Sequence, residues 1–378
     1  MKKQNWVIIG TFLMMIFGVA ILNLLTPTKE FSEKENRVLA NMPQLTLSAY
    51  MSGSFAADYE NFIKDQFVAR DHWIGVKRIA ETSIGKREIK EIYLADDDYL
   101  IEKHHGIYET EQASQNIISL TAFVENAVER YGENHVRVIV APNAVNILQD
   151  KLPPYADTKA EHQYLQGLAK SLPAGTWLDS EAILKEHKEE YLYYKTDHHW
   201  TTLAAFYVAE GWRDSIGLPP MSVNDYEVEV ASDLFKGTIE AKVGGETATD
   251  TIEIYQLKQP FSYTVTYGEN GEVSDTLYHF EALETKDMYT LFFGGNYPEV
   301  RIEIDNGSDR KLLVVKDSYA HCFLPFAFSD FGEITMVDMR YYNQSLQLYM
   351  DERDFTDVLF LNNVSGFAAD QSIGKLIN

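Results

Sequence analysis

Cysteine is almost absent from this sequence of 378 residues, in which Cys322 is the only one. A single thiol excludes an intramolecular disulfide, and it excludes the thiolate clusters that hold structural zinc or iron–sulfur centres. A chain of this length can bury enough apolar surface to fold without such links. The fold is therefore expected to depend on its hydrophobic residues, which make up 45 % of the composition.

Positive charge is also scarce, with 33 Lys and Arg residues against 57 Asp and Glu residues. The formal net charge of −24 repels nucleic acids and anionic lipid headgroups. We therefore exclude nucleic acid as a partner. The same charge suits a soluble body that is exposed outside a cell.

Charged residues are missing from one long stretch near the amino terminus, Trp6 to Leu25. An apolar run of about 20 residues is long enough to cross a bilayer as a helix. Lys2 and Lys3 precede the run, which puts that end in the cytoplasm and the rest of the chain outside. A cleaved signal peptide is the alternative, and export follows from either.

Three regions are predicted along the chain. Residues 1–28 form a membrane anchor or signal, residues 29–54 a tether, and residues 55–378 a large domain. Between about 221 and 296 the sequence alternates apolar and polar residues and carries many turn residues. This alternating pattern favours a β-rich antiparallel insertion or lid outside the main sheet.

The last eighty residues predict the core of the domain. KLLVV (311–315), EITMVDM (333–339) and DVLFLNN (357–363) are typical of buried strands, and QSLQLYMDE (344–352) is typical of a helix. Alternating strands and helices predict right-handed crossovers and a parallel sheet. We therefore expect a three-layer α/β fold.

A serine follows the first of these strands, in the segment KDSYAHC (316–322). Active groups of open parallel sheets gather at the carboxyl ends of the strands. We expect a helix to begin here, with free N–H groups that hold a developing oxyanion beside Ser318. A serine becomes a nucleophile only when a base takes its proton, and the base needs an orienting carboxylate.

The segment TDHHWT (196–201) supplies a base and a carboxylate. Side chains two positions apart in an extended segment point the same way. Asp197 is therefore expected to accept a hydrogen bond from one ring nitrogen of His199, while the other nitrogen faces Ser318. Two alternatives stay open: an Asp–His pair that only anchors a loop, and a metal site that also includes His198 and His321. The spacing does not match a helical HExxH motif.

TDHHWT upstream and KDSY downstream resemble the DHHW family of extracytoplasmic proteins, which is related to the SGNH-type acetyltransferases of alginate O-acetylation. Further blocks are similar to that family, among them FSEKENRVLANMPQLT and APNAVNILQDKLP. The resemblance implies an SGNH-hydrolase-like fold with Ser318 as nucleophile, His199 as base and Asp197 as orienting acid. Lys316 stands where many relatives have glycine.

Four further residues are candidates for binding the substrate or the oxyanion. Asn143 follows an apolar strand, and Asn296 lies in a Gly-Gly-Asn segment that is also a common turn signal. Arg340 and Tyr341 follow EITMVDM, at the sheet edge expected to carry Ser318. A surface salt bridge is the alternative role for Arg340, and ordinary packing is the alternative role for Tyr341.

These features predict a cell-surface enzyme that needs no metal or other cofactor. Ser318 would take an acyl group and pass it to a sugar hydroxyl or to water, as an O-acetyltransferase or esterase of a surface polysaccharide or cell-wall glycan does. Acetyl-CoA is not available outside the cell, so transfer implies a membrane O-acyltransferase partner as acyl donor. The alternative is a non-catalytic glycan-binding or assembly protein with the same fold.

Overall fold

The computed structural model of the protein describes residues 3–32, 37–245, 247–268 and 271–377. The chain divides into two compact units. Unit 1 combines Met1–Lys86 with Ala241–Thr247, and unit 2 combines Arg87–Glu240 with Ala248–Asn378. All of the site residues predicted from the sequence belong to unit 2.

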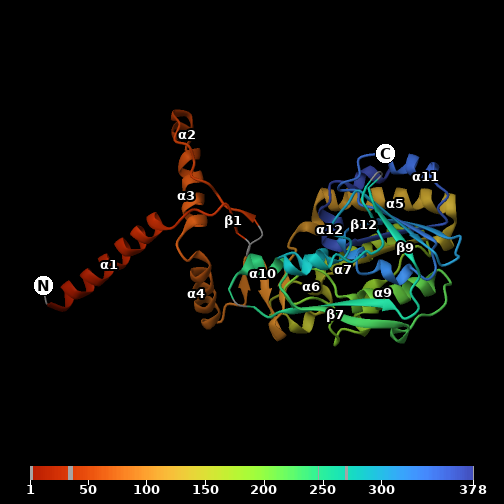
Figure 1. The fold of residues 1–378 in the computed structure, drawn as a ribbon, viewed down its shortest axis with the longest axis horizontal. Helices are drawn as coiled ribbons and strands as arrows, with labels where there is room; N and C mark the ends of the chain where they lie inside the picture. The colour runs from red at the N-terminus through yellow and green to blue at the C-terminus, as the bar shows by residue number, and fades with distance from the viewer. Residues whose placement is uncertain (1–2, 33–36, 246, 269–270, 378) are drawn as a thin grey trace. The chain divides into compact units, whose positions relative to one another are not determined.

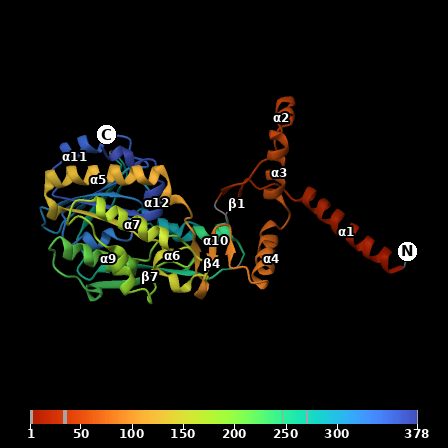
Figure 2. The ribbon, with the colours of Figure 1, turned by 180° about the vertical axis from the view of Figure 1, so that it is seen from behind.

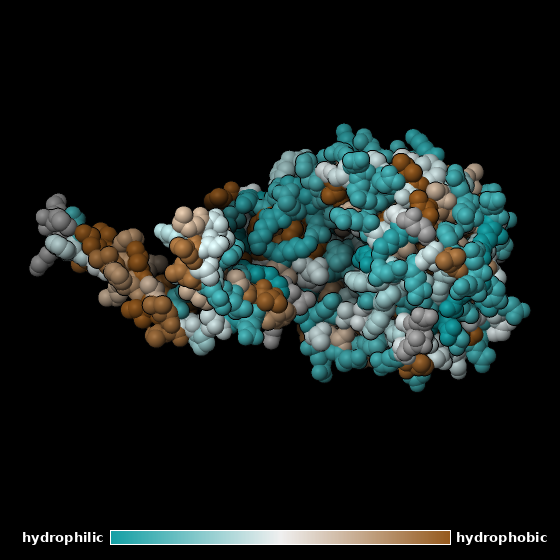
Figure 3. All heavy atoms as spheres, turned by 90° about the horizontal axis from the view of Figure 1, so that it is seen from above, coloured by the Kyte–Doolittle hydropathy of each residue, from teal (hydrophilic) through white to brown (hydrophobic). Residues whose placement is uncertain are grey.

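Unit 1 begins with the long apolar helix α1, Lys3–Leu25 (Figure 1). Within it, the segment Asn5–Leu25 is long and apolar enough to cross a membrane, and its most apolar stretch is not buried inside the protein. Hydrophobic side chains, brown in Figure 3, follow this helix along its length. The predicted amino-terminal apolar helix is therefore present.

The rest of unit 1 consists of a small hairpin and three short helices. β1 (Phe31–Ser32) pairs antiparallel with β2 (Arg37–Val38). The helices are α2 (Leu47–Ser52), α3 (Ser54–Gln66) and α4 (Arg70–Ser83). The structure describes every residue of these three helices, and none of them is buried. They therefore contribute little to a hydrophobic core.

In the described part of the chain, unit 2 is built on a seven-stranded sheet of order β10–β9–β11–β13–β12–β14–β6 (Figures 1 and 2). The strands are β6 (Val136–Ala141), β9 (Tyr263–Tyr267), β10 (Val273–Ser274), β11 (Glu299–Ile304), β12 (Lys311–Lys316), β13 (Glu333–Val337) and β14 (Asp357–Asn363). β13, β12, β14 and β6 are parallel, as predicted. β11, β9 and β10 are antiparallel, so the sheet is mixed and not wholly parallel.

The region between residues 221 and 296 differs from the predicted insertion. β7 (Tyr226–Phe235) and β8 (Asp250–Leu257) form a separate antiparallel hairpin, and α10 (Thr238–Val243) lies between them in sequence. β9 and β10, in contrast, extend the main sheet from β11. The prediction that the whole region lies outside the main sheet is wrong. Alternation within a strand does not reveal which neighbour the strand pairs with.

Apolar side chains cover both faces of the parallel strands. On β12, Leu313 and Val315 belong to one core, with α5 (Glu111–Tyr131), α7 (Lys159–Ser171), α11 (Leu346–Asp351) and α12 (Val364–Ala369). Leu312 and Val314 belong to the other core, with α9 (Thr202–Ser215) and the β7–β8 hairpin. Successive side chains of a strand point to opposite faces. The predicted three-layer α/β architecture is thereby confirmed.

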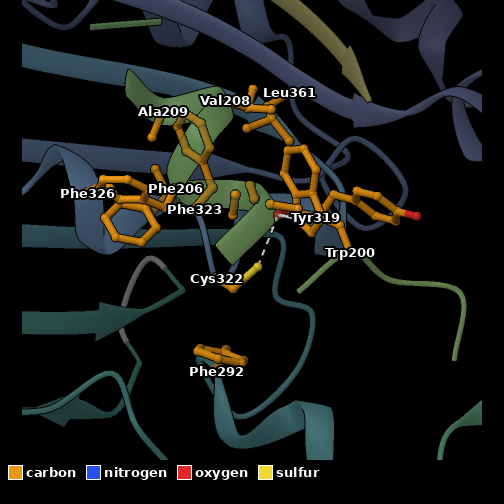
Figure 4. Packing of buried hydrophobic residues seen from close by; sticks show 14 of the residues in the cluster. Trp200, Phe206, Val208, Ala209, Phe292, Tyr319, Cys322, Phe323, Phe326 and Leu361 are labelled. Atoms are coloured by element: carbon orange, nitrogen blue, oxygen red, sulfur yellow. Dashed lines mark hydrogen bonds between the residues drawn. The ribbon is translucent and has the colours of Figure 1, made fainter. Parts of the chain in front are cut away.

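Smaller elements complete unit 2. They are a three-stranded antiparallel sheet of β3 (Glu88–Ile89), β4 (Ile92–Leu94) and β5 (Leu100–Glu102), and the short helices α6 (Ala144–Ile147) and α8 (Ser180–Glu186). Aromatic side chains from α9 and from the chain after β12 pack together, with ring centroids of Phe206 and Phe326 5.4 Å apart (Figure 4). This core fixes α9 against the segment that carries Ser318.

Candidate active site

Ser318 lies just beyond the carboxyl end of β12. The residues that follow form a 3-10 turn, Ser318–Ala320, and not the expected α-helix. Asp317 holds this turn, because its Oδ1 accepts from the Tyr319 amide at 2.9 Å and its Oδ2 accepts from the Asn363 amide at 2.7 Å. The expected helix start at Ser318 is therefore present, with Asp317 as its N-cap, but as a single 3-10 turn.

The loop that carries Asp197 and His199 is held tightly at its base. Tyr193 and Trp200 form an antiparallel bridge on either side of it. The Trp200 indole Nε1 donates to the carbonyl of Tyr319 at 3.0 Å, and Figure 4 shows the two side chains next to each other. Trp200 is completely buried.

Ser318, His199 and Asp197 form a continuous chain of hydrogen bonds. Ser318 Oγ lies 2.7 Å from His199 Nε2, and His199 Nδ1 lies 2.6 Å from Asp197 Oδ1. A carboxylate only accepts hydrogen bonds, so Nδ1 carries the proton that is donated to Asp197. Nε2 is then free to accept from the Ser318 hydroxyl. Ser318 and His199, 119 positions apart in the sequence, meet at this point.

Asp197 is only 4 % exposed and yet is held in its charged form. Burial by itself would raise the pKa of this carboxyl, but the neighbouring rings of His198 and His199 and the accepted hydrogen bonds lower that pKa well below its usual range. Asp197 Oδ2 accepts from the amide of Thr238 at 2.8 Å and from its hydroxyl at 3.1 Å. Sequence reasoning did not identify Thr238, since it lies about 40 residues away in a segment with no recognisable motif.

Gly237 allows the chain to approach Asp197 closely. A Cβ atom at Gly237 would lie 2.2 Å from Asp197 Cβ and 2.3 Å from Asp197 Oδ2. No side chain fits in that space, so glycine is needed for the Thr238 amide to reach the carboxylate. A lone glycine in a loop is too common to have indicated this contact.

Tyr289 covers one face of the His199 imidazole. The two rings stack with centroids 3.8 Å apart and planes inclined by 14°. The Tyr289 hydroxyl is 3.3 Å from the Ser318 carbonyl oxygen and 3.5 Å from Cys322 Sγ. The stacking limits rotation of the imidazole and keeps Nε2 directed at Ser318. Tyr289 lies in short 3-10 turns, whose sequence has no periodic signal that could have identified it.

The Lys316 side chain points into a buried polar cluster beside the 3-10 turn that begins at Ser318. Its Nζ donates to His321 Nε2 at 2.7 Å and lies 3.5 Å from both Asp338 Oδ2 and Asn296 Oδ1. Burial lowers the pKa of Lys316 to about 8, although the Asp338 carboxylate acts in the opposite direction. Burial, followed by the charge of Lys316, also lowers the pKa of His321. His321 is thus a neutral acceptor for Lys316.

Arg340 and Tyr341 lie at the exposed side of this cluster. Arg340 Nε and Nη2 donate to the two oxygens of Asp338 at 2.8 and 2.6 Å, and Nη2 is 3.3 Å from Asn296 Oδ1. The guanidinium carbon lies 5.5 Å from the centroid of the Tyr341 ring, which is 47 % exposed. Arg340 therefore makes a salt bridge with Asp338 and also reaches the surface.

Asn143 belongs to a different buried network. Its Nδ2 donates to Tyr108 Oη at 3.2 Å and to Glu161 Oε2 at 2.8 Å, while its Oδ1 accepts from Asn363 Nδ2 at 2.8 Å. Both amide hydrogens are already donated, so Asn143 has none to offer to an oxyanion. Burial raises the pKa of the Glu161 carboxyl to about 7.

The metal alternative has a geometric basis in Asp197, His198 and His199, whose ligand atoms lie within 4.8 Å of one another. Asp197 and His199 are hydrogen-bonded to each other, and His321 is bonded to Lys316. An ion would have to replace these bonds. The same atoms are already arranged for proton transfer between Ser318 and His199.

Comparisons with known proteins agree with the fold. A family model described as DHHW protein matches residues 174–337, and a model described as SGNH hydrolase-like domain, acetyltransferase AlgX, matches residues 93–232. No curated protein matches the chain.

Two solved structures are similar over about three quarters of the chain. A DHHW family protein from Eubacterium siraeum has a TM-score of 0.64 at 23 % identity, over 77 % of this chain and 96 % of that chain. Bacillus cereus PatB1 with a sulfonyl adduct has a TM-score of 0.58 at 25 % identity, over 74 % of this chain and 98 % of that chain. The predicted resemblance to DHHW proteins and to the SGNH-type AlgX acetyltransferases is therefore confirmed, on an SGNH-hydrolase-like α/β fold.

Proposed function

We propose that this protein is an extracytoplasmic acyl-ester enzyme, an O-acetyltransferase or esterase that acts on a cell-surface glycan. The observation that carries the proposal is the 2.7 Å contact between Ser318 Oγ and His199 Nε2, with Asp197 bonded to the other ring nitrogen. An imidazole oriented by a carboxylate is the group that activates a serine nucleophile. Ser318 is partly exposed, whereas the other two residues are buried, so a substrate can approach its hydroxyl.

In the proposed reaction, Ser318 Oγ attacks the acyl carbonyl carbon while its proton moves to His199 Nε2. The carbonyl oxygen takes up the electron pair, and Asp197 stabilises the imidazolium. Collapse of this intermediate breaks the ester bond, and the imidazolium returns its proton to the leaving alcohol. The acyl-enzyme then reacts by the same steps with a sugar hydroxyl, which is transfer, or with water, which is hydrolysis.

Arg340, Asn296 and Tyr341 are proposed to contact the substrate. Asp338 accepts two hydrogen bonds from Arg340 and holds its guanidinium in one orientation. The exposed Tyr341 ring offers an apolar face of the kind on which sugars stack. Asn296 lies between Arg340 and Lys316 and is the remaining candidate for an oxyanion donor. We do not propose Asn143 as an oxyanion donor, because both of its side-chain amide hydrogens are already donated to Tyr108 and Glu161.

The comparisons support acyl chemistry. The matched AlgX model is described as an acetyltransferase, and PatB1 forms a sulfonyl adduct. We propose a single-pass membrane location with unit 2 outside the cell, or release after cleavage of α1. Transfer would then depend on a membrane O-acyltransferase that delivers the acyl group, and a retained α1 would keep the two proteins in the same membrane.

Labelling with a fluorophosphonate or sulfonyl fluoride tests this proposal. The wild type is expected to be labelled at Ser318, as located by peptide mass spectrometry, and Ser318→Ala should not be labelled. Ser365→Ala is the matched control, because this serine is also partly buried and lies in α12, just after the neighbouring strand β14; this change should leave labelling unchanged. Absence of label on folded wild type, or label that persists in Ser318→Ala, would favour the non-catalytic glycan-binding role.

A further inference from the structure

Helix α4 of unit 1 has an exposed apolar face that the proposed enzyme mechanism does not use. Trp73, Val76 and Ile79 are 46, 56 and 68 % exposed, and Ile84, which follows the helix, is 84 % exposed. We call these four residues the α4 apolar face. Contiguous apolar surface of this kind marks a contact with another molecule or with a membrane.

The opposite side of α4 is packed within unit 1. Arg78 Nη1 donates to the carbonyl oxygen of Gly244 at 2.9 Å, and a Cβ atom at Gly244 would come within 2.7 Å of Ile74 Cγ2. Successive residues of a helix are separated by about 100°, so Val76 and Ile79 point away from Ile74. The α4 apolar face is therefore not the side that unit 1 covers.

The start of α4 is tied to the end of α1. The Val68 amide donates to Asn23 Oδ1, in the last turn of α1, at 2.9 Å. Two residues earlier, Gln66 exchanges hydrogen bonds of 2.8 and 2.9 Å with the backbone of Lys29. If α1 spans the bilayer, its outer end lies at the membrane surface. α4 begins at Arg70, so it starts at that surface as well.

Charge separates the two parts of the chain. Residues 26–86, which follow the predicted span, contain 8 Lys and Arg against 8 Asp and Glu, whereas residues 87–378 contain 23 against 49. Anionic headgroups therefore repel the bulk of unit 2 and do not repel the segment that contains α4. Trp73 adds a side chain of the type that is enriched at membrane interfaces.

We propose that the α4 apolar face lies in the headgroup region of the bilayer that α1 spans, so that α4 is an interfacial helix. The proposal depends on the retained anchor of the proposed location and is independent of the chemistry at Ser318. Contact of α4 with lipid would fix the orientation of unit 1 on the membrane. The α4 apolar face would then not be available to bind another protein.

Spin labels on the full chain in vesicles of phosphatidylcholine and phosphatidylglycerol test this proposal. The label is attached to Val76→Cys, and the matched control is Val230→Cys on β7, because both valines are 56 % exposed. Thr82→Cys places a label on another side of α4. Cys322 should not react, because it is fully buried and burial raises the pKa of its thiol to about 12.

Collision rates with oxygen, which enters the bilayer, and with a water-soluble nickel chelate are then compared. We expect an oxygen-to-nickel ratio at residue 76 several-fold higher than at residues 230 and 82. Equal ratios would overturn the proposal, as would exclusion of both reagents at residue 76, which would indicate cover by protein. Release of the chain by alkaline carbonate would overturn the anchor and with it this proposal, whereas labelling of Ser318 in the same sample tests the enzyme separately.

Discussion

Two buried polar networks lie at the carboxyl edge of the same sheet. The serine network consists of Ser318, His199 and Asp197, and the asparagine network consists of Asn143, Tyr108, Glu161 and Asn363. They touch at one point, because the Asn363 amide donates to Asp317, the residue before Ser318. Ser318 of the first network and Asn143 of the second each follow a buried strand, β12 and β6.

The two networks differ in how they end. In the asparagine network the Asn143 amide hydrogens and the Tyr108 hydroxyl all end on buried acceptors, and Glu161 is pushed toward its neutral form. In the serine network the carboxyl of Asp197 is kept charged, and the chain of bonds ends at a partly exposed hydroxyl. A network in which every donor already has a buried acceptor stabilises the fold. A network that includes a partly exposed hydroxyl also has a group that can react with a substrate.

The largest effect is expected when the carboxylate of the serine network is made neutral. In Asp197→Asn the side chain can donate as well as accept, so it no longer selects the tautomer in which His199 Nε2 faces Ser318. The second-order rate of fluorophosphonate labelling should fall about 10³- to 10⁴-fold with the fold intact by circular dichroism. A fall of less than tenfold would mean that Asp197 only anchors the loop.

A smaller loss is expected when the backbone is forced away from Asp197. Gly237→Ala introduces a Cβ that would lie 2.2 Å from Asp197 Cβ, so the carboxylate or the Thr238 amide must shift. Displacement of about 1 Å reduces rates about 100-fold, and labelling should fall by this order. The control is Gly167→Ala in α7, where a Cβ meets no atom within 4 Å. Equal labelling of the two variants would show that the close approach is unimportant.

The asparagine network should affect stability and leave labelling unchanged. The Glu161 pKa is raised from 4.5 to about 7. Between these values the folded protein keeps a proton that the unfolded chain has lost, so this group makes stability fall as pH rises through the window and has no further effect above it. The loss amounts to about 3 kcal/mol at most.

Glu161→Gln removes that dependence. Urea unfolding of wild type and variant at pH 5 and pH 8 should therefore give a wild type that loses more stability than the variant over this range. Parallel loss in both proteins would contradict the assignment to Glu161. A changed labelling rate in Glu161→Gln would contradict the distinction between the two networks.

The sequence predicted much of this fold because the signals were local. A run without charge indicated α1, continuous apolar segments indicated β12, β13 and β14, and the two-residue spacing of Asp197 and His199 indicated a paired acid and base. Predictions failed where the outcome depended on distant partners. Strands β9 and β10 joined the main sheet, and the segment after Ser318 formed a 3-10 turn.

By itself the sequence determined which chemical groups are present, their local conformation and the faces they present, because these depend on side-chain type and on periods of a few residues. Only the tertiary structure decided that Thr238, Gly237 and Tyr289 surround the Asp197–His199 pair. It also decided that Asn143 is occupied within its own network. These contacts join segments tens of residues or more apart, and they exist only because packing of the two cores brings those segments to one edge of the sheet.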